Sequence, residues 1–241
     1  MKTAILSDIH GNATALRAVL ADLEAFTVDL VISLGDNIGY GPEPEAVVSM
    51  LRKGNIPSVI GNHELAINRP DFLKWFNPTA RTSLEKTRKM ISPETTAYIS
   101  KLGYCMVLGN CRFVHGFPPG SPTVYLFEVT PQKLKNTLER MNDWICFVGH
   151  THLLEIISLK GNEVHREFLK EGEFHINLDE KYIINAGSVG QPRDGDNNAK
   201  YLIWDAEASK VIVRYVPYDV DETVRKIYQA GLPEQHAWRL M

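Results

Sequence analysis

The first third of the chain alternates short apolar runs with segments of helical periodicity. Apolar runs typical of buried strands span residues 3–7, 30–34 and 57–60, and helical segments at residues 12–25 and 44–54 separate them. The second helical segment starts with Pro44 and stops at Gly54, as is typical of helix termini. This β-α-β-α-β order predicts a largely parallel sheet with helices packed on its faces.

The pattern turns helical between residues 71 and 102, where prolines interrupt it. We expect a helical excursion over the sheet at about residues 70–102, after the third strand. Phe72, Trp75 and Phe76 make this segment aromatic, and two interpretations stay open: the rings pack in the core, or they cap a substrate site.

The remainder of the chain is predicted to be mostly strands. They are expected at residues 104–108, 112–114, 144–148, 154–159, 164–168, 182–185, 201–204 and 211–216, with a helix at 131–141. A final helix should begin near Asp219 or Asp221 and end at Gly231. No repeat or linker interrupts the pattern, so we predict one α/β domain over residues 1–241. Its expected architecture is an αββα sandwich of two mixed β-sheets flanked by helices.

Charge and composition narrow the choice of partners. Lys and Arg number 26 against 29 Asp and Glu among 241 residues, and the net charge of −3 argues against nucleic-acid binding by charge. Cys105, Cys111 and Cys146 form no C-x-x-C pair and are expected to be free thiols. Met1 leads almost directly into a strand, and no apolar stretch reaches the ~18 residues of a membrane span, so we expect a cytoplasmic protein without a membrane partner.

Five polar clusters each follow an apolar run at the point where the predicted strand ends. They are Asp8-Ile9-His10, Gly35-Asp36, Gly61-Asn62-His63-Glu64, His115-Gly116 and Gly149-His150-Thr151-His152. Because ligands gather outside the carboxyl ends of parallel strands, clusters far apart in sequence are expected to meet at one point. In the D-x-H and H-x-H pairs, residues two apart on an extended segment point to the same side.

The candidate donors in these clusters are two aspartates, one asparagine and five histidines, without a cysteine. Mixed nitrogen and oxygen donors suit Mn, Fe, Co, Ni or Zn better than Mg or Ca alone. Eight donors exceed the four of a tetrahedral zinc site and suit two ions, the recurrent arrangement for displacement at phosphorus. Two divalent ions, two carboxylates and a bridging hydroxide would leave one net positive charge, which favours an anionic phosphoester.

In this order the clusters match the pattern D-x-H, G-D, G-N-H-[DE], H and G-H-x-H, and the chain resembles the calcineurin-like metallophosphoesterase superfamily. The segment Asn185-Ala186-Gly187-Ser188-Val189-Gly190-Gln191-Pro192-Arg193 is similar to the loop that follows the site in the small bacterial phosphodiesterase-like branch. The resemblance spans most of the chain. It implies a hydrolase with two divalent metal ions, manganese being expected first and Fe, Ni, Co or Zn as alternatives.

The resemblance also implies roles for individual residues. Asp8, His10 and His152 would hold the first ion, Asp36 would bridge both ions, and Asn62, His115 and His150 would complete the second. His63 would be the histidine beside the substrate oxygens that is not a ligand, which makes it a candidate general acid. Asn12 follows the first cluster closely and is a further candidate for a substrate contact.

One position departs from the family pattern. Protein phosphatases and symmetrical dinucleoside tetraphosphate hydrolases carry G-D-x-x-D-R, in which the arginine clamps phosphate, whereas this chain has Gly39 and Tyr40 at the last two positions. Without that clamp we expect phosphodiesters or phosphoanhydrides of small molecules or nucleotides as substrates, attacked by a metal-bridging hydroxide. Arg193 is the candidate replacement for the missing arginine.

Two alternatives stay open at this point. The first is a broad-specificity phosphomonoesterase, protein phosphatase activity included. The second is a non-catalytic scaffold of the same fold, a class in which the site has degenerated. The complete ligand set, together with His63, favours the enzyme.

Overall fold

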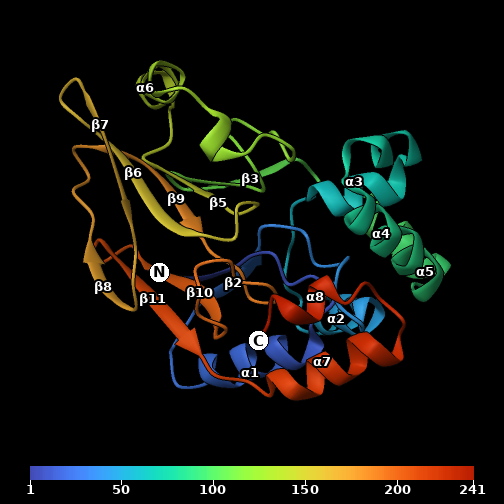
Figure 1. Ribbon diagram of the computed structural model, residues 1–241. Coiled ribbons are helices and arrows are strands. Elements are labelled where there is room, and N and C mark those ends of the chain that lie inside the picture. Colours follow the sequence, from blue (N-terminus) through green and yellow to red (C-terminus); the bar gives the residue numbers. More distant parts are fainter.

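Two β-sheets pack face to face in the computed structural model, which describes residues 1–241, and helices cover both outer sides (Figure 1). The first sheet contains β1 (Lys2–Leu6), β2 (Leu30–Ser33), β8 (Gly172–His175), β10 (Ala199–Asp205) and β11 (Lys210–Val216). The second contains β3 (Cys105–Leu108), β4 (Cys111–Val114), β5 (Ile145–Val148), β6 (Leu154–Lys160), β7 (Glu163–Phe168) and β9 (Lys181–Ala186). The predicted αββα sandwich of two mixed sheets is confirmed.

The order of the strands brings the polar clusters to one end of the sandwich. The first sheet has the order β2-β1-β10-β11-β8, and within it only β1 and β2 run parallel. The second has the order β3-β4-β5-β9-β6-β7, in which β4, β5 and β9 run parallel. Since parallel neighbours end at the same edge of a sheet, the loops that follow these strands emerge together.

An apolar layer between the sheets fixes their relative position. Ile5 and Leu202 of the first sheet belong to the same buried cluster as Phe113 and Phe147 of the second. The two phenyl rings stack with their centroids 5.4 Å apart. Full burial of one such side chain contributes about 1.5–3 kcal/mol to folding, so the layer holds the two sets of loops in register.

Helices cover the outer face of each sheet. Helices α1 (Ala13–Leu23), α2 (Pro44–Lys53) and α7 (Val220–Gln229) lie on the side of the first sheet, and α6 (Pro131–Arg140) lies on the second (Figure 1). As predicted, α2 starts with Pro44 and is followed by Gly54. Helix α7 follows Asp219, whose side chain accepts the backbone N–H of Glu222, so the first of the two predicted starts is the right one.

The helical excursion is also confirmed, although it begins earlier than expected. It consists of α3 (Asn62–Asn68), η1 (Pro70–Trp75), α4 (Pro78–Met90) and α5 (Pro93–Ile99). Its start lies at Asn62 because the carboxylate of Glu64 accepts the backbone N–H of Gly61 (3.0 Å) and caps the helix. Asn62 and His63 therefore lie in the first turn of a helix, where their side chains are buried.

Three elements differ from the sequence prediction. Residues 57–60 do not form a regular strand; they make isolated parallel bridges, from Ser58 to Ser33 and from Val59 to Gly103. Pro57 has no N–H to donate, and the chain turns into α3 almost at once. Strand β8 and the short helix α8 (Gln235–Trp238) were not predicted, because neither contains an apolar run like those that indicated the equally short strands β2 and β5.

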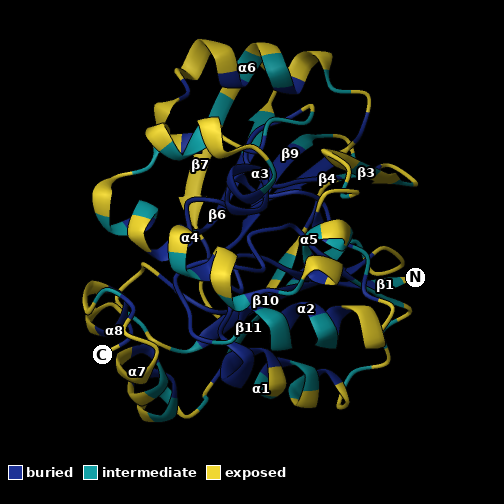
Figure 2. Cartoon of the chain, turned by 90° about the vertical axis from the view of Figure 1, so that its right-hand side faces the viewer, coloured by how far each residue is buried: buried dark blue, intermediate teal, exposed yellow.

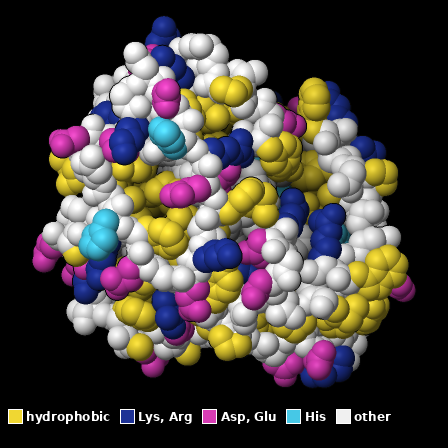
Figure 3. Space-filling view, turned by 60° about the vertical axis from the view of Figure 1, so that its left-hand side comes forward, with side chains coloured by type: hydrophobic (Ala, Val, Ile, Leu, Met, Phe, Trp, Pro, Cys, Tyr) yellow, Lys and Arg dark blue, Asp and Glu magenta, His cyan; other side chains and the backbone are white.

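Burial is highest at the centre of the molecule. The central strands, such as β5 and β10, and the loops between them are buried, while exposed residues line the outward faces of α1, α4 and α6 (Figure 2). Over the face drawn in Figure 3, basic and acidic side chains alternate with hydrophobic ones and form no field of one sign. None of the helices combines the length and the hydropathy that crossing a membrane requires.

Asp22, near the end of α1, ties this helix to the first sheet. Its carboxylate accepts hydrogen bonds from the Tyr201 hydroxyl (2.7 Å) and the Arg214 guanidinium (2.8 and 3.1 Å). Burial opposes ionisation of Asp22, but these hydrogen bonds outweigh it and lower its pKa. A carboxylate whose folded pKa is lowered stabilises the fold above its unfolded pKa of about 3.9, and the stabilisation disappears as the pH falls through the folded pKa.

We expect Asp22→Asn to lower the free energy of unfolding by about 1–2 kcal/mol at pH 7, with the difference from wild type shrinking below about pH 4. Urea unfolding at a series of pH values measures both effects. Asp179→Asn is the control, because this exposed carboxylate makes no ion pair. A difference between wild type and Asp22→Asn that stays constant down to pH 3 would contradict the role of the charge.

Candidate metal centre

The five polar clusters meet in one buried site. Asp8 and His10 follow β1, Asp36 follows β2, His115 follows β4, and His150 and His152 follow β5, while Asn62 and His63 come from the first turn of α3. All eight side chains are buried, although every one of them is polar or charged. Burial of so many donors in one place requires partners for their lone pairs.

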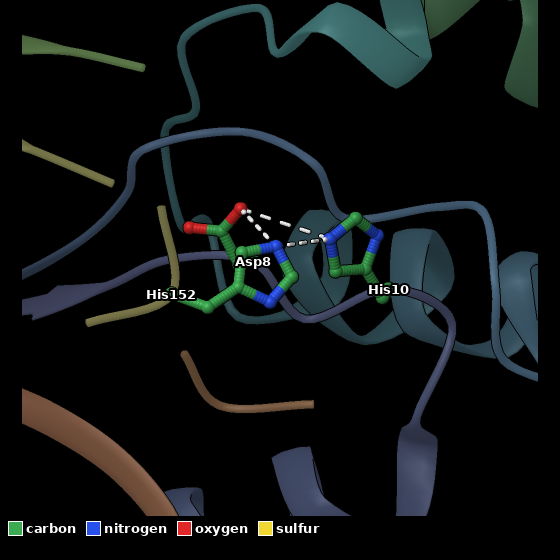
Figure 4. Close-up of side chains that lie close together, drawn as sticks. All are labelled: Asp8, His10 and His152. Carbon is green, nitrogen blue, oxygen red and sulfur yellow. Dashed lines mark hydrogen bonds and ion pairs between the residues drawn. The ribbon is translucent and has the colours of Figure 1, made fainter. Parts of the chain in front are cut away.

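One half of the site consists of Asp8, His10 and His152, drawn in Figure 4. Asp8 Oδ1 lies 3.3 Å from His152 Nε2 and 3.7 Å from His10 Nε2. The two Nε2 atoms are 3.1 Å apart, and all three side chains point toward one another (Figure 4). Asp8 Oδ1 accepts no hydrogen bond.

The other half consists of Asp36, His115, His150 and Asn62. Asp36 Oδ2 lies 3.2 Å from His115 Nε2, which in turn is 3.1 Å from His150 Nδ1 and 3.0 Å from Asn62 Oδ1. The same carboxylate oxygen is 3.8 Å from His10 Nε2 in the first half. Asp36 therefore lies between the two groups of donors.

Backbone carbonyls determine which nitrogen of each ring faces the site. A carbonyl only accepts, so the ring nitrogen beside it carries the proton, and the other nitrogen is left with a lone pair. The pairs are His10 Nδ1 with Ile38 O (3.1 Å), His115 Nδ1 with Leu34 O (2.9 Å), His152 Nδ1 with Gln191 O (2.5 Å) and His150 Nε2 with Thr123 O (3.3 Å). Such partners orient metal-ligating histidines.

This donor arrangement fits a metal ion. The Nε2 lone pairs of His10 and His152 face each other at 3.1 Å beside an oxygen of Asp8 that has no donor. Two lone pairs at that distance repel each other unless a cation or a proton lies between them. The second half offers a carboxylate, an amide oxygen and two imidazole nitrogens around one point, the donors that borderline divalent ions prefer.

The backbone at the donors is in a conformation that residues other than glycine rarely adopt. Its φ angle is positive at Asp8 (51°), His10 (50°), Asp36 (50°), His150 (69°) and His152 (62°). Non-glycine residues in this region cost up to a few kcal/mol each, and they persist where the surrounding structure enforces them. Their concentration at the donors is an independent indication of a functional site.

Glu64 is a supporting residue to which the sequence analysis assigned no role. Its buried carboxylate accepts the backbone N–H groups of Asp36 (2.9 Å), Asn37 (2.7 Å) and Gly61 (3.0 Å). It thereby joins the loop after β2 to the start of α3, the two segments that supply Asp36 and Asn62. Its place three residues after Gly61, at the start of a helix, is the signal that would have identified it as a capping residue.

The charges of the two carboxylates are stabilised by the surrounding rings. Burial opposes ionisation of Asp8 and Asp36, but neighbouring histidines outweigh it and lower the pKa of both. His115 responds in the opposite sense: burial disfavours its cation, yet Asp36 raises its pKa to about 9. Burial, reinforced by His115, lowers the pKa of His150 to about 3. A metal ion would displace the proton that His115 holds in the protein alone.

His63 lies beside the donors without being hydrogen-bonded through its ring. Its Nε2 is 3.8 Å from Asp36 Oδ2, and its Nδ1 is buried without a partner. The ring makes edge contacts with Tyr40 and Phe76, at centroid distances of 4.5 and 5.1 Å. A Cβ atom on Gly39, whose φ is +85°, would clash with this imidazole, so a side chain there is incompatible with its position. Burial lowers the pKa of His63 to about 3.

The two expected substrate contacts differ in their surroundings. Asn12 caps α1 by accepting the N–H of Ala15 (3.0 Å), and its amide donates to Gly190 O (3.1 Å), so its side chain is engaged within the protein. Arg193 is exposed and interacts with the Tyr40 hydroxyl, where it lowers the pKa of Tyr40 against the larger raising effect of burial. A substrate contact stays a prediction for both residues.

Comparison with known proteins agrees with this site. Residues 1–209 match the family described as the calcineurin-like phosphoesterase superfamily domain. An uncharacterised protein from Methanocaldococcus jannaschii is 34% identical over 242 residues, which cover 98% of this chain and 96% of that protein. A metallophosphoesterase from Sphaerobacter thermophilus has a similar crystal structure, with a TM-score of 0.84, 36% identity, and coverage of 100% of this chain and 98% of that one.

A hypothetical protein from Pyrococcus horikoshii OT3 shares the fold with a TM-score of 0.80 at 19% identity, over 99% of this chain and 97% of that chain. The family match covers most of the sequence, and it includes every donor of the buried cluster. This chain therefore belongs to the calcineurin-like phosphoesterase superfamily.

Proposed function

We propose that this protein is a metal-dependent phosphoesterase that hydrolyses phosphodiester or phosphoanhydride bonds of small molecules, nucleotides included. The observation that carries the proposal is the buried cluster of facing ring nitrogens and carboxylates, a donor set that suits divalent cations. A cavity of about 720 Å³ opens onto Asn62 and His150, so a substrate has access to the second half of the cluster. Membership of the family supports the same class of reaction.

We further propose that the site holds two divalent ions, with manganese as the first expectation. Asp8, His10 and His152 would bind one ion, Asn62, His115 and His150 the other, and Asp36 both. Bound ions would supply an activated water and neutralise charge on the phosphoryl oxygens. The protein itself would hold the imidazole rings in fixed orientations through their hydrogen bonds to backbone carbonyls, within a buried site.

The choice of substrate follows from charge at the site. A phosphomonoester approaches two negative charges at pH 7, whereas a phosphodiester carries one. Tyr40, packed between His10 and His63, occupies the place of the family's clamping arginine, so this site has one guanidinium fewer to neutralise a dianion. Arg193 is the residue that we propose as a contact for one phosphoryl oxygen.

The position of His63 suits a group that acts on the leaving oxygen. Its backbone N–H donates to Asp36 Oδ1 (2.9 Å), which fixes the residue beside the proposed bridging ligand. Its ring is held by Tyr40 and Phe76 rather than by hydrogen bonds, so its nitrogens are free for a substrate. Burial keeps this imidazole neutral in the protein alone. It would donate a proton to the leaving oxygen, or stabilise charge on the phosphoryl group, once an anionic phosphoryl group beside it raises its pKa.

A substrate panel with Mn²⁺ tests the function. It compares bis-nitrophenyl phosphate, nitrophenyl phosphate, cyclic nucleotides, dinucleoside polyphosphates and a phosphopeptide. We expect kcat/KM for a diester or an anhydride to exceed that for the phosphopeptide by about tenfold or more, the equivalent of one charge-assisted interaction. Turnover of the phosphopeptide alone would instead identify a protein phosphatase, and no turnover of any ester would favour the scaffold.

Metal content tests the two-ion proposal. Elemental analysis of protein equilibrated with excess Mn²⁺ and desalted should give two ions per chain. In Asp36→Ala we expect fewer than one ion and a fall in turnover of about 100-fold or more, because losing a shared ligand weakens both sites. Asp179→Ala, an exposed carboxylate, is the matched control. A firm stoichiometry of one ion in the wild type would refute the proposal.

Leaving-group dependence tests His63. If its ring protonates the leaving oxygen, His63→Ala should retain both ions and lose about 10²–10⁴-fold in turnover of alkyl esters. It should lose much less on nitrophenyl esters, whose leaving group needs little protonation. His165→Ala, an exposed histidine on β7, is the control. Equal losses on both ester types would indicate electrostatic stabilisation, and loss of metal would identify His63 as a ligand.

A further inference from the structure

An aromatic cavity opens directly beside the candidate metal centre. It has a volume of about 720 Å³, within the range of small-molecule sites. Asn62 and His150 form its inner end. One wall comes from η1 and α4 of the helical excursion, through Phe72, Trp75 and Phe76, and the other comes from the segment between β4 and α6.

Exposed aromatic residues lie in and next to the two walls. Trp75 lines the cavity and is 77% exposed. Phe127, in η2 (Leu126–Glu128), is 60% exposed and lies outside the lining, next to it in the chain. Tyr125 stacks on His150 at a centroid distance of 3.7 Å and on Phe127 at 4.8 Å, with interplanar angles of 16° and 18°. A stack of three nearly parallel rings therefore leads from a proposed metal ligand to the surface.

The charge of the cavity limits what it can bind. No lysine or arginine lines it, and Glu128 is the one acidic residue in its wall. A phosphate away from the inner end would have no cationic partner and would be repelled by Glu128, so the phosphate of a substrate belongs at the inner end, beside the candidate metal centre. The rest of the cavity is suited to the uncharged part of the same molecule.

Polar groups near the rings favour a planar heterocycle over an aliphatic chain. Asn77 uses its Oδ1 to cap α4, by accepting the N–H of Ala80 (2.9 Å), and keeps its amide N–H groups free. Glu128 and Asn77 thus offer an acceptor and a donor beside stacked rings. Both side chains are exposed to water, so an aliphatic chain covering them would displace water without replacing its hydrogen bonds, whereas a nucleobase would pair with them and stack.

We propose that this cavity binds the nucleobase of a nucleotide-type ester whose phosphate lies at the metal centre, with Trp75 as the principal ring of the outer wall. The proposal rests on the proposed phosphoesterase function and specifies its substrate class. Aromatic stacking contributes about 5- to 150-fold in affinity per base, so its removal is measurable.

Three diesters with the same scissile bond provide the kinetic test. Adenosine 5′-(methyl phosphate), ribose 5-(methyl phosphate) and octyl methyl phosphate differ only in the group that would enter the cavity, and benzyl methyl phosphate adds a plain aromatic ring while keeping an alkyl leaving group. With Mn²⁺ we expect kcat/KM for the adenosine ester to exceed that for the ribose ester by at least fivefold. It should also exceed that for the benzyl ester, which cannot pair with Asn77 or Glu128.

Variants of Trp75 test whether the preference for the adenosine ester depends on this ring. Trp75→Ala should remove most of the preference for the adenosine ester by lowering kcat/KM for that ester at least fivefold, a larger loss than for the ribose ester, and Trp75→Phe should keep the preference. Phe168→Ala is the matched control, because this ring is 68% exposed but lies on β7, in the other part of the molecule (Figure 1). The exposure of Trp75 makes its substitution compatible with folding.

Fluorescence supplies a readout that needs no turnover. Titration with AMP should quench the tryptophan emission and ribose 5-phosphate should not, and the quench should be absent in Trp75→Phe. Equal kcat/KM for the adenosine and ribose esters, or a preference for the octyl ester, would overturn the proposal. If no ester is hydrolysed, the phosphoesterase function fails separately, and the titration alone decides whether the cavity binds a base.

Discussion

Two carboxylates and five imidazoles are buried together at the centre of this protein, and no lysine or arginine side chain is buried beside them. Uncompensated burial of such groups costs several kcal/mol, so the site is stable only with cations or protons between its donors. The left-handed backbone at Asp8, His10, Asp36, His150 and His152 adds strain to that cost. The apolar layer between the sheets provides the stability that tolerates both.

The need to hold polar groups close together also explains the contacts that surround the candidate metal ligands. Glu64 secures three backbone N–H groups of two loops, and four carbonyls turn the imidazoles so that one lone pair of each faces inward. These contacts keep mutually repelling groups in place. A site assembled from flexible loops would relax away from this arrangement, so the rigidity of the sandwich is a condition for its chemistry.

The convergence of the polar clusters was predictable from the sequence. Crossover connections make strands run parallel, so their carboxyl ends lie at the same edge of the sheet, and each polar cluster directly follows such an end. Periodicity and apolar runs identified elements such as α1, β11 and the four-residue strand β5, but not β8 or α8, whose four residues contain no apolar run. Residues 57–60 look like a strand in composition, yet tertiary context leaves them with single bridges. Tautomers, positive φ angles and the cap made by Glu64 depend on contacts across distant segments, which no local pattern contains. The aromatic residues 72, 75 and 76 illustrate the same limit, because two of the rings pack partly in a core cluster while all three also line the cavity.

Asn12 connects the candidate metal centre to a part of the chain outside the family match. The match ends at residue 209, but Tyr218 and Thr223 lie beyond it, and both contact the Asn12 side chain, at 3.3 and 3.2 Å. Asn12 stands two residues after His10, so a shift of α7 would be transmitted to the loop that carries two of the proposed ligands. The C-terminal helices are thus a place where sequence change can adjust the geometry of the candidate centre while every donor stays the same.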